Sequence, residues 1–96
     1  MYSLIFPKPF NQSYRALVKG NKELEKRISK TLKLLLQNPF YPSLKTHRVN
    51  TRNYGQKWSS WITGDLRLVW DFHQEEKMTI ILLAIGKHSG KHKAYK

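Results

Sequence analysis

The chain has 96 residues, and its 40% hydrophobic and 12% aromatic content is that of an ordinary globular protein. This length predicts one compact domain covering residues 1–96. Because there is no cysteine, disulfides, thiolate metal sites and a cysteine nucleophile are excluded. The charge is far from balanced, since 18 Lys and Arg stand against six Asp and Glu, a net charge of +12. Such a basic surface repels itself, and we expect a polyanionic partner, with nucleic acid as the first candidate.

Two features of the sequence argue against a membrane or secreted protein. No segment approaches the run of about 18 apolar residues that a membrane-spanning helix needs. The apolar segment at residues 2–6 is too short for a signal peptide and has no basic residues before it. We therefore expect a cytoplasmic protein with no membrane partner.

The first half of the chain predicts a short strand followed by two helices. Residues 2–6 are apolar and are followed by Pro7, which predicts the strand. Helical spacing of apolar residues predicts a first helix over residues 10–19. A second helix should begin after Asn21, a good N-cap residue, and end before Pro39. The two helices are expected to form a hairpin.

The second half predicts a long loop and three strands. Residues 39–53 have no clear period and read as a loop. The strands are expected at 55–62, 66–72 and 78–85, with Gly86 ending the last of them. Side chains along strand 66–72 point alternately to an apolar face and to the opposite face of the sheet. The apolar side carries Leu66, Leu68, Trp70 and Phe72.

The order β-α-α-β-β-β predicts an α+β fold, in which a helical hairpin packs on one face of a twisted antiparallel sheet. Trp70 lies on the apolar side of its strand and should belong to the core. The other face of the sheet should then be partly open. Arg67 is the charged residue that we expect to stand on that open face.

Three short motifs in this order resemble the RelE/ParE superfamily of toxins. They are Leu44-Lys45-Thr46-His47, Asp65-Leu66-Arg67-Leu68-Val69-Trp70 and Ile85-Gly86-Lys87-His88, followed by a late Tyr95. The pattern is most similar to the YafQ/RelE-like branch, and the resemblance covers essentially the whole chain. It departs from that branch at Trp61, where a YafQ-like enzyme has another histidine. Lys57 is the only lysine on the strand that carries a lysine pair in RelE, and Pro42 replaces the glutamate found in YoeB.

The resemblance implies a toxin of a type II toxin-antitoxin system, which cleaves mRNA in the ribosomal A site. Its partners would be mRNA, the ribosome and an acidic antitoxin that folds on binding. No cofactor or metal is needed, because RNA supplies its own nucleophile, the 2′-OH. Histidine suits both proton transfers, and arginine suits the developing charge on phosphate. The products would be a 2′,3′-cyclic phosphate and a 5′-hydroxyl.

The expected roles follow from residue chemistry and from the resemblance together. His88 would be the general acid, and His47 or Asp65 the general base. Arg67 would bind the scissile phosphate and Tyr95 would orient the substrate. A second group of cations is expected to bind RNA phosphates along the loop, sheet and tail. This group is Lys45, Arg48, Arg52, Lys57, Lys87, Lys91 and Lys93.

Simpler explanations stay open at these positions. Arg67 could pair with Asp65 or Asp71 across the sheet, and Asp65 could serve only the turn that contains it. Two other functions also remain: a ParE-like inhibitor of DNA gyrase, and an RNA-binding or ribosome-binding module without catalysis. A metal nuclease is disfavoured, because the six carboxylates form no spaced pair and the histidines show no ligand spacing.

Overall fold

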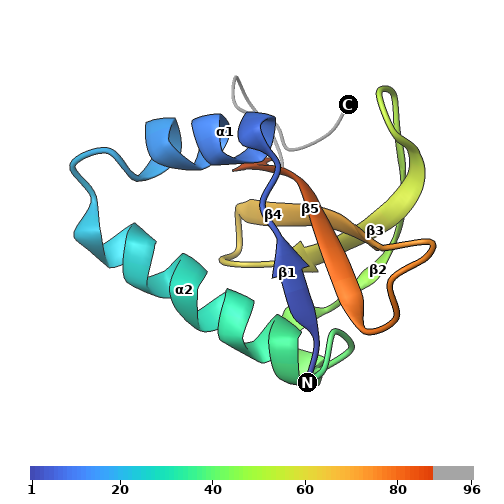
Figure 1. Ribbon diagram of the computed structural model, residues 1–96. Coiled ribbons are helices and arrows are strands. Elements are labelled where there is room, and N and C mark those ends of the chain that lie inside the picture. Colours follow the sequence, from blue (N-terminus) through green and yellow to red (C-terminus); the bar gives the residue numbers. More distant parts are fainter. Residues whose placement is uncertain (88–96) are drawn as a thin grey trace.

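The computed structural model describes residues 1–87 and shows two helices and a five-stranded sheet (Figure 1). The order of elements confirms the α+β prediction of a strand, two helices and then consecutive strands. No helix in this part of the chain is long and apolar enough to cross a membrane. The elements are β1 (Ser3–Ile5), α1 (Lys8–Val18), α2 (Lys22–Gln37), the 3-10 turn η1 (Pro42–Leu44), β2 (His47–Thr51), β3 (Gly55–Trp61), β4 (Leu66–Phe72) and β5 (Thr79–Lys87).

The sheet is mixed rather than wholly antiparallel as expected. Its order is β1-β5-β4-β3-β2, and β1 runs parallel to β5 while the other three pairings are antiparallel. Almost the whole chain lies between β1 and β5, so no short turn forces these two strands to run in opposite directions. The successive strands from β2 onwards are joined by short turns, which explains why they pair antiparallel.

The loop predicted over residues 39–53 is wrong in its second half, because His47–Thr51 forms the edge strand β2. The turn after it is closed by Thr51, whose hydroxyl donates to the Gly55 carbonyl at 2.8 Å and accepts from the Tyr54 N–H at 2.9 Å. The segment His-Arg-Val-Asn-Thr is polar and largely exposed. It therefore lacks the apolar alternation that identifies a strand, and its pairing with β3 decides its conformation.

The last strand continues past the position where Gly86 was expected to end it. Gly86 pairs with Arg67, and Lys87 pairs with Leu66. Further along, Val69 pairs with Ala84 and Trp70 with Leu82, so Leu83 is an extra residue that forms a bulge.

Both helices cover one face of the sheet (Figure 1). Trp70 is fully buried in the hydrophobic core, which confirms the prediction for this residue. Asn21 is the N-cap of α2, and its side-chain oxygen accepts a hydrogen bond from the Leu24 N–H at 3.1 Å. Burial raises the pKa of the Tyr14 phenol above its ordinary value, and the Glu25 carboxylate adds to this shift. The core consists of Phe10, Ile28, Leu35, Leu44, Ile62, Leu66, Leu68, Trp70, Ile80, Leu82 and Ile85.

Candidate nucleic-acid interface

One end of the sheet collects several of the predicted site residues. Strands β2 and β4 begin there, and β3 and β5 end there, because the neighbouring pairings are antiparallel. Trp61, the last residue of β3, pairs with Arg67, which in turn pairs with Gly86. His47 starts β2 opposite Ser59. The register thus brings His47, Arg67 and the end of β5 to the same end of the sheet.

The imidazole of His47 is exposed, and one of its nitrogens is already occupied. Nδ1 lies 2.9 Å from the carbonyl oxygen of Lys45. A carbonyl can only accept a hydrogen bond, so Nδ1 must carry the proton. In the neutral ring Nε2 is then the basic nitrogen, with its lone pair available. The local backbone therefore selects the tautomer that a general base needs.

Two cations lie against the indole of Trp61. The ammonium of Lys45 is 4.1 Å from the ring centroid, and the guanidinium carbon of Arg67 is 4.0 Å from it. Lys45 reaches this position from a left-handed backbone conformation with φ 47° and ψ 41°. This conformation is uncommon for a residue with a Cβ atom and is found preferentially at functional sites. Cation–π attraction holds both positive charges beside the same aromatic ring.

Arg67 was predicted to stand on an open face of the sheet, but this prediction is wrong, because only 4% of the residue is exposed. Its Nη1 donates to the carbonyls of Thr63 at 2.9 Å, Gly64 at 3.1 Å and Leu66 at 3.2 Å. These bonds tie the guanidinium to the β3–β4 turn. Neither Asp65 nor Asp71 forms an ion pair with it within residues 1–87. Its buried Nε has no hydrogen-bond partner among these residues.

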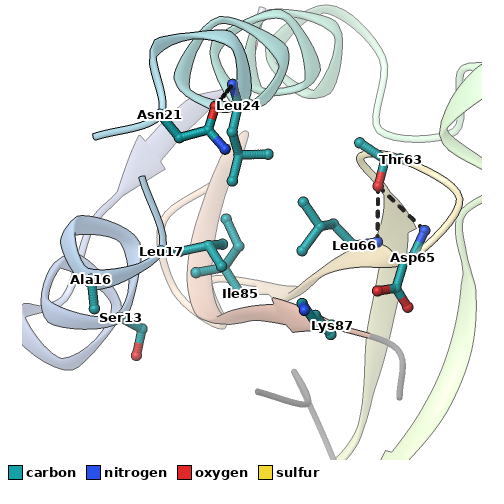
Figure 2. A pocket seen from close by; sticks show the side chains of 10 residues that line it. All are labelled: Ser13, Ala16, Leu17, Asn21, Leu24, Thr63, Asp65, Leu66, Ile85 and Lys87. Atoms are coloured by element: carbon teal, nitrogen blue, oxygen red, sulfur yellow. Dashed lines mark hydrogen bonds between the residues drawn. The ribbon is translucent and has the colours of Figure 1, made fainter. Parts of the chain in front are cut away.

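Asp65 faces a different part of the molecule. It lies in the turn between β3 and β4, where its own N–H donates to the Thr63 hydroxyl at 3.3 Å. Its carboxylate lines a groove of about 800 Å³ between the helices and the sheet, together with Lys87 and apolar side chains of α1 and α2 (Figure 2). His47 does not line this groove. The two candidate bases are therefore not part of one cavity.

Three other predicted RNA-binding cations lie away from this end of the sheet or are already engaged. Arg52 is in the β2–β3 turn, at the opposite end of these strands from Trp61. Arg48 lies 4.9 Å from the Trp58 ring and donates to the Gln56 side chain at 2.9 Å. Lys57 forms an ion pair of 2.9 Å with Asp71.

The remaining predicted site residues lie outside the described part of the chain. They are His88, Lys91, Lys93 and Tyr95. Within residues 1–87 no three His, Cys, Asp or Glu side chains come close enough to hold a metal ion. Trp61 is the functional candidate that sequence reasoning missed. Its only signal was that it stands where relatives of the predicted branch have a histidine.

Comparison with known proteins gives matches at the level of structure. No family model matches the chain, and no curated protein matches it in sequence. A YoeB/ParE toxin from Agrobacterium tumefaciens is 16% identical, with a TM-score of 0.70, and the match covers 91% of this chain and 99% of that one. A metal-bound toxin from Helicobacter pylori is 26% identical, with a TM-score of 0.71, covering 92% of this chain and 96% of that one. The chain has the fold of the RelE/ParE superfamily.

The RelE/ParE fold confirms the predicted resemblance, while the YafQ branch remains a prediction. A conserved hypothetical protein from Helicobacter pylori shares the fold as well, at 23% identity and a TM-score of 0.61, with coverage of 92% and 96%. The structural neighbours include proteins described as toxins.

Proposed function

We propose that this protein is the toxin of a type II toxin-antitoxin system and acts as a ribosome-dependent endoribonuclease of the YafQ/RelE-like branch. The observation that carries the proposal is the position of His47. Its Nε2 is available as a base because the Lys45 carbonyl holds Nδ1, at the end of the sheet where Lys45 and Arg67 converge on Trp61.

In the proposed reaction Nε2 of His47 removes the proton from the 2′-OH, and the 2′-oxygen attacks the adjacent phosphorus. The bond from phosphorus to the 5′-oxygen breaks, and His88 donates a proton to that oxygen. The products are a 2′,3′-cyclic phosphate and a 5′-hydroxyl, and no metal takes part. Between the two candidate bases, the fixed tautomer favours His47 over Asp65, which lines a separate groove.

The positive charges would stabilise the phosphorane-like transition state. Lys45 is exposed and can reach a phosphate oxygen directly. Arg67 is buried and held by three carbonyls beside the Trp61 indole, so its positive charge would stabilise the phosphate through space rather than by direct contact. Tyr95 would orient the substrate by contact with a base or the backbone.

The proposed partners are mRNA, the ribosome and an acidic antitoxin, in the cytoplasm. A net charge of +12 suits both RNA and an acidic protein segment that wraps the toxin and folds on binding. The proposed RNA contacts at this end of the sheet are Lys45 and Lys87, with Lys91 and Lys93 following in the sequence.

The test is primer extension on a reporter mRNA, with and without ribosomes. We expect cuts only with ribosomes, and their loss in the double variant His88→Ala, Arg67→Ala. His73→Ala is the matched histidine control, since His73 lies in the β4–β5 turn at the opposite end of β4. If the folded protein binds RNA but gives no cuts, it is a binding module. Inhibition of DNA gyrase without cuts would instead favour the ParE-like alternative.

A further inference from the structure

A small hollow lies beside the proposed catalytic end of the sheet. It has a volume of about 340 Å³ and is bounded by α2, η1 and the end of β3. Pockets that bind small molecules begin at about 300 Å³, so the hollow has room for one nucleotide. Its walls combine charged, hydroxyl and apolar groups, chiefly Arg27, Lys30, Ser43, Leu44, Trp61 and Ile62.

The charge of the hollow is entirely positive. Arg27 and Lys30 are its charged residues, and no carboxylate lines it. The ion pair found within residues 1–87 is Lys57–Asp71, so neither cation of the hollow is neutralised by a carboxylate there. Arg27 and Lys30 each directly precede a buried residue of α2, Ile28 and Thr31 respectively. These two cations therefore line a concave surface.

Trp61 connects the hollow to the proposed site. Its side chain lines the hollow, and the same indole carries the ammonium of Lys45 and the guanidinium of Arg67. A strand of RNA that places a phosphate near Lys45 can therefore continue past Trp61 into a hollow that no carboxylate lines.

We propose that this hollow is a second RNA subsite, which binds the nucleotide next to the scissile phosphate; the inference rests on the proposed function. Arg27 and Lys30 bind the phosphate of that nucleotide, and the Ser43 hydroxyl offers a further hydrogen bond. The apolar walls and the edge of Trp61 contact its base or ribose. The subsite gives the enzyme a grip on the substrate strand beyond the reacting bond.

Binding of a short single-stranded RNA with a 2′-O-methyl group at each position tests the subsite without cleavage or ribosomes. The test variant is Arg27→Ala, Lys30→Ala. The control is Lys26→Ala, Lys33→Ala, which removes the same charge from α2 at two positions that do not line the hollow. Fluorescence anisotropy over a range of salt concentrations should show the slope of log affinity against log salt becoming shallower by about 1 to 2 in the test variant. The affinity of the test variant should fall roughly tenfold relative to the control.

An equal loss in the two double variants would overturn the subsite, because charge alone would then explain binding. A loss of ribosome association with unchanged RNA binding would overturn it too, since the occupant would then be ribosomal RNA. A second readout is the indole N–H resonance of Trp61, identified with Trp61→Phe. Adding 5′-AMP should shift this resonance and leave that of the buried Trp70 in place, and Arg27→Ala, Lys30→Ala should abolish the shift. A protein that passes both tests yet cuts no mRNA keeps the subsite and loses the endoribonuclease proposal.

Discussion

Ser60 accepts a hydrogen bond from the indole nitrogen of Trp70 at 2.8 Å, in the centre of the core. The Ser60 hydroxyl is 2.7 Å from the hydroxyl of Thr46, which itself donates to the Pro39 carbonyl at 2.6 Å. Because the Thr46 proton is used on Pro39, Ser60 must be the donor to Thr46. This relay runs from the core to the residue between Lys45 and His47. It therefore fixes the segment that carries the proposed base.

These hydrogen bonds predict different effects on the free energy of unfolding when either of two adjacent serines is replaced. Ser60→Ala leaves the buried Trp70 N–H without an acceptor, which should lower the free energy of unfolding by about 1–3 kcal/mol. Ser59 is equally buried, but its hydroxyl has no hydrogen-bond partner within residues 1–87. Ser59→Ala should therefore be neutral or slightly stabilising. Urea denaturation of the two variants measures the difference, and equal losses would show that the relay does not stabilise the protein.

The fold could be predicted from the sequence wherever a one-sided apolar pattern was present. The alternation around Trp70 and the capped helix after Asn21 are such cases, and both are confirmed. The strand that begins at His47 was missed, because an exposed edge strand has no buried side to create a pattern. The parallel pairing of β1 with β5 was missed because it joins segments that are distant in the sequence.

The candidate site was less predictable than the fold. The motif identified Arg67, but alternation alone placed it on an open face, and it is in fact bonded to turn carbonyls. Three bonds to backbone carbonyls cannot be read from residue types. The fixed tautomer of His47 likewise depends on the left-handed conformation of Lys45, which no sequence pattern indicates.

Arg67 should contribute to stability as well as to activity. A surface residue that only binds phosphate could be removed without effect on folding. Arg67 is buried, and its Nη1 group shares its two protons among three carbonyls of the β3–β4 turn and the start of β4, so Arg67→Ala should cost about 1.5–3 kcal/mol of unfolding free energy. Lys45→Ala, which removes the exposed cation from the same indole, should change stability by less than about 0.5 kcal/mol. Thermal or urea unfolding would contradict the interpretation if both variants had the stability of the native protein.

Lys57 should contribute less to RNA binding than its charge suggests. Its ammonium is paired with the Asp71 carboxylate at 2.9 Å, whereas Lys45 has no carboxylate partner within residues 1–87. Lys45→Ala should make the salt dependence of RNA affinity shallower by about 1, and Lys57→Ala should leave it almost unchanged. Asp71→Asn should strengthen RNA binding by freeing Lys57. Equal slopes for the two lysine variants would mean that the ion pair opens when RNA binds.

The sharpest test of the proposed mechanism is His47, because its two nitrogens have separate tasks. His47→Ala removes the base and should slow ribosome-dependent cleavage by about 10²–10⁴-fold. His47→Asn retains a side-chain N–H that can donate to the Lys45 carbonyl, but it offers no base in place of Nε2. If His47 accepts the 2′-OH proton, both variants should be equally slow in single-turnover cleavage. If His47 only positions the segment after Lys45, the asparagine variant should recover activity.

The control for the His47 variants is His73→Ala. Nδ1 of His73 accepts the N–H groups of Glu75 and Glu76 at 3.1 and 2.9 Å, so this histidine has the opposite tautomer. Its loss should leave the cleavage rate unchanged, and a fall equal to that of His47→Ala would show that removing any histidine damages the protein.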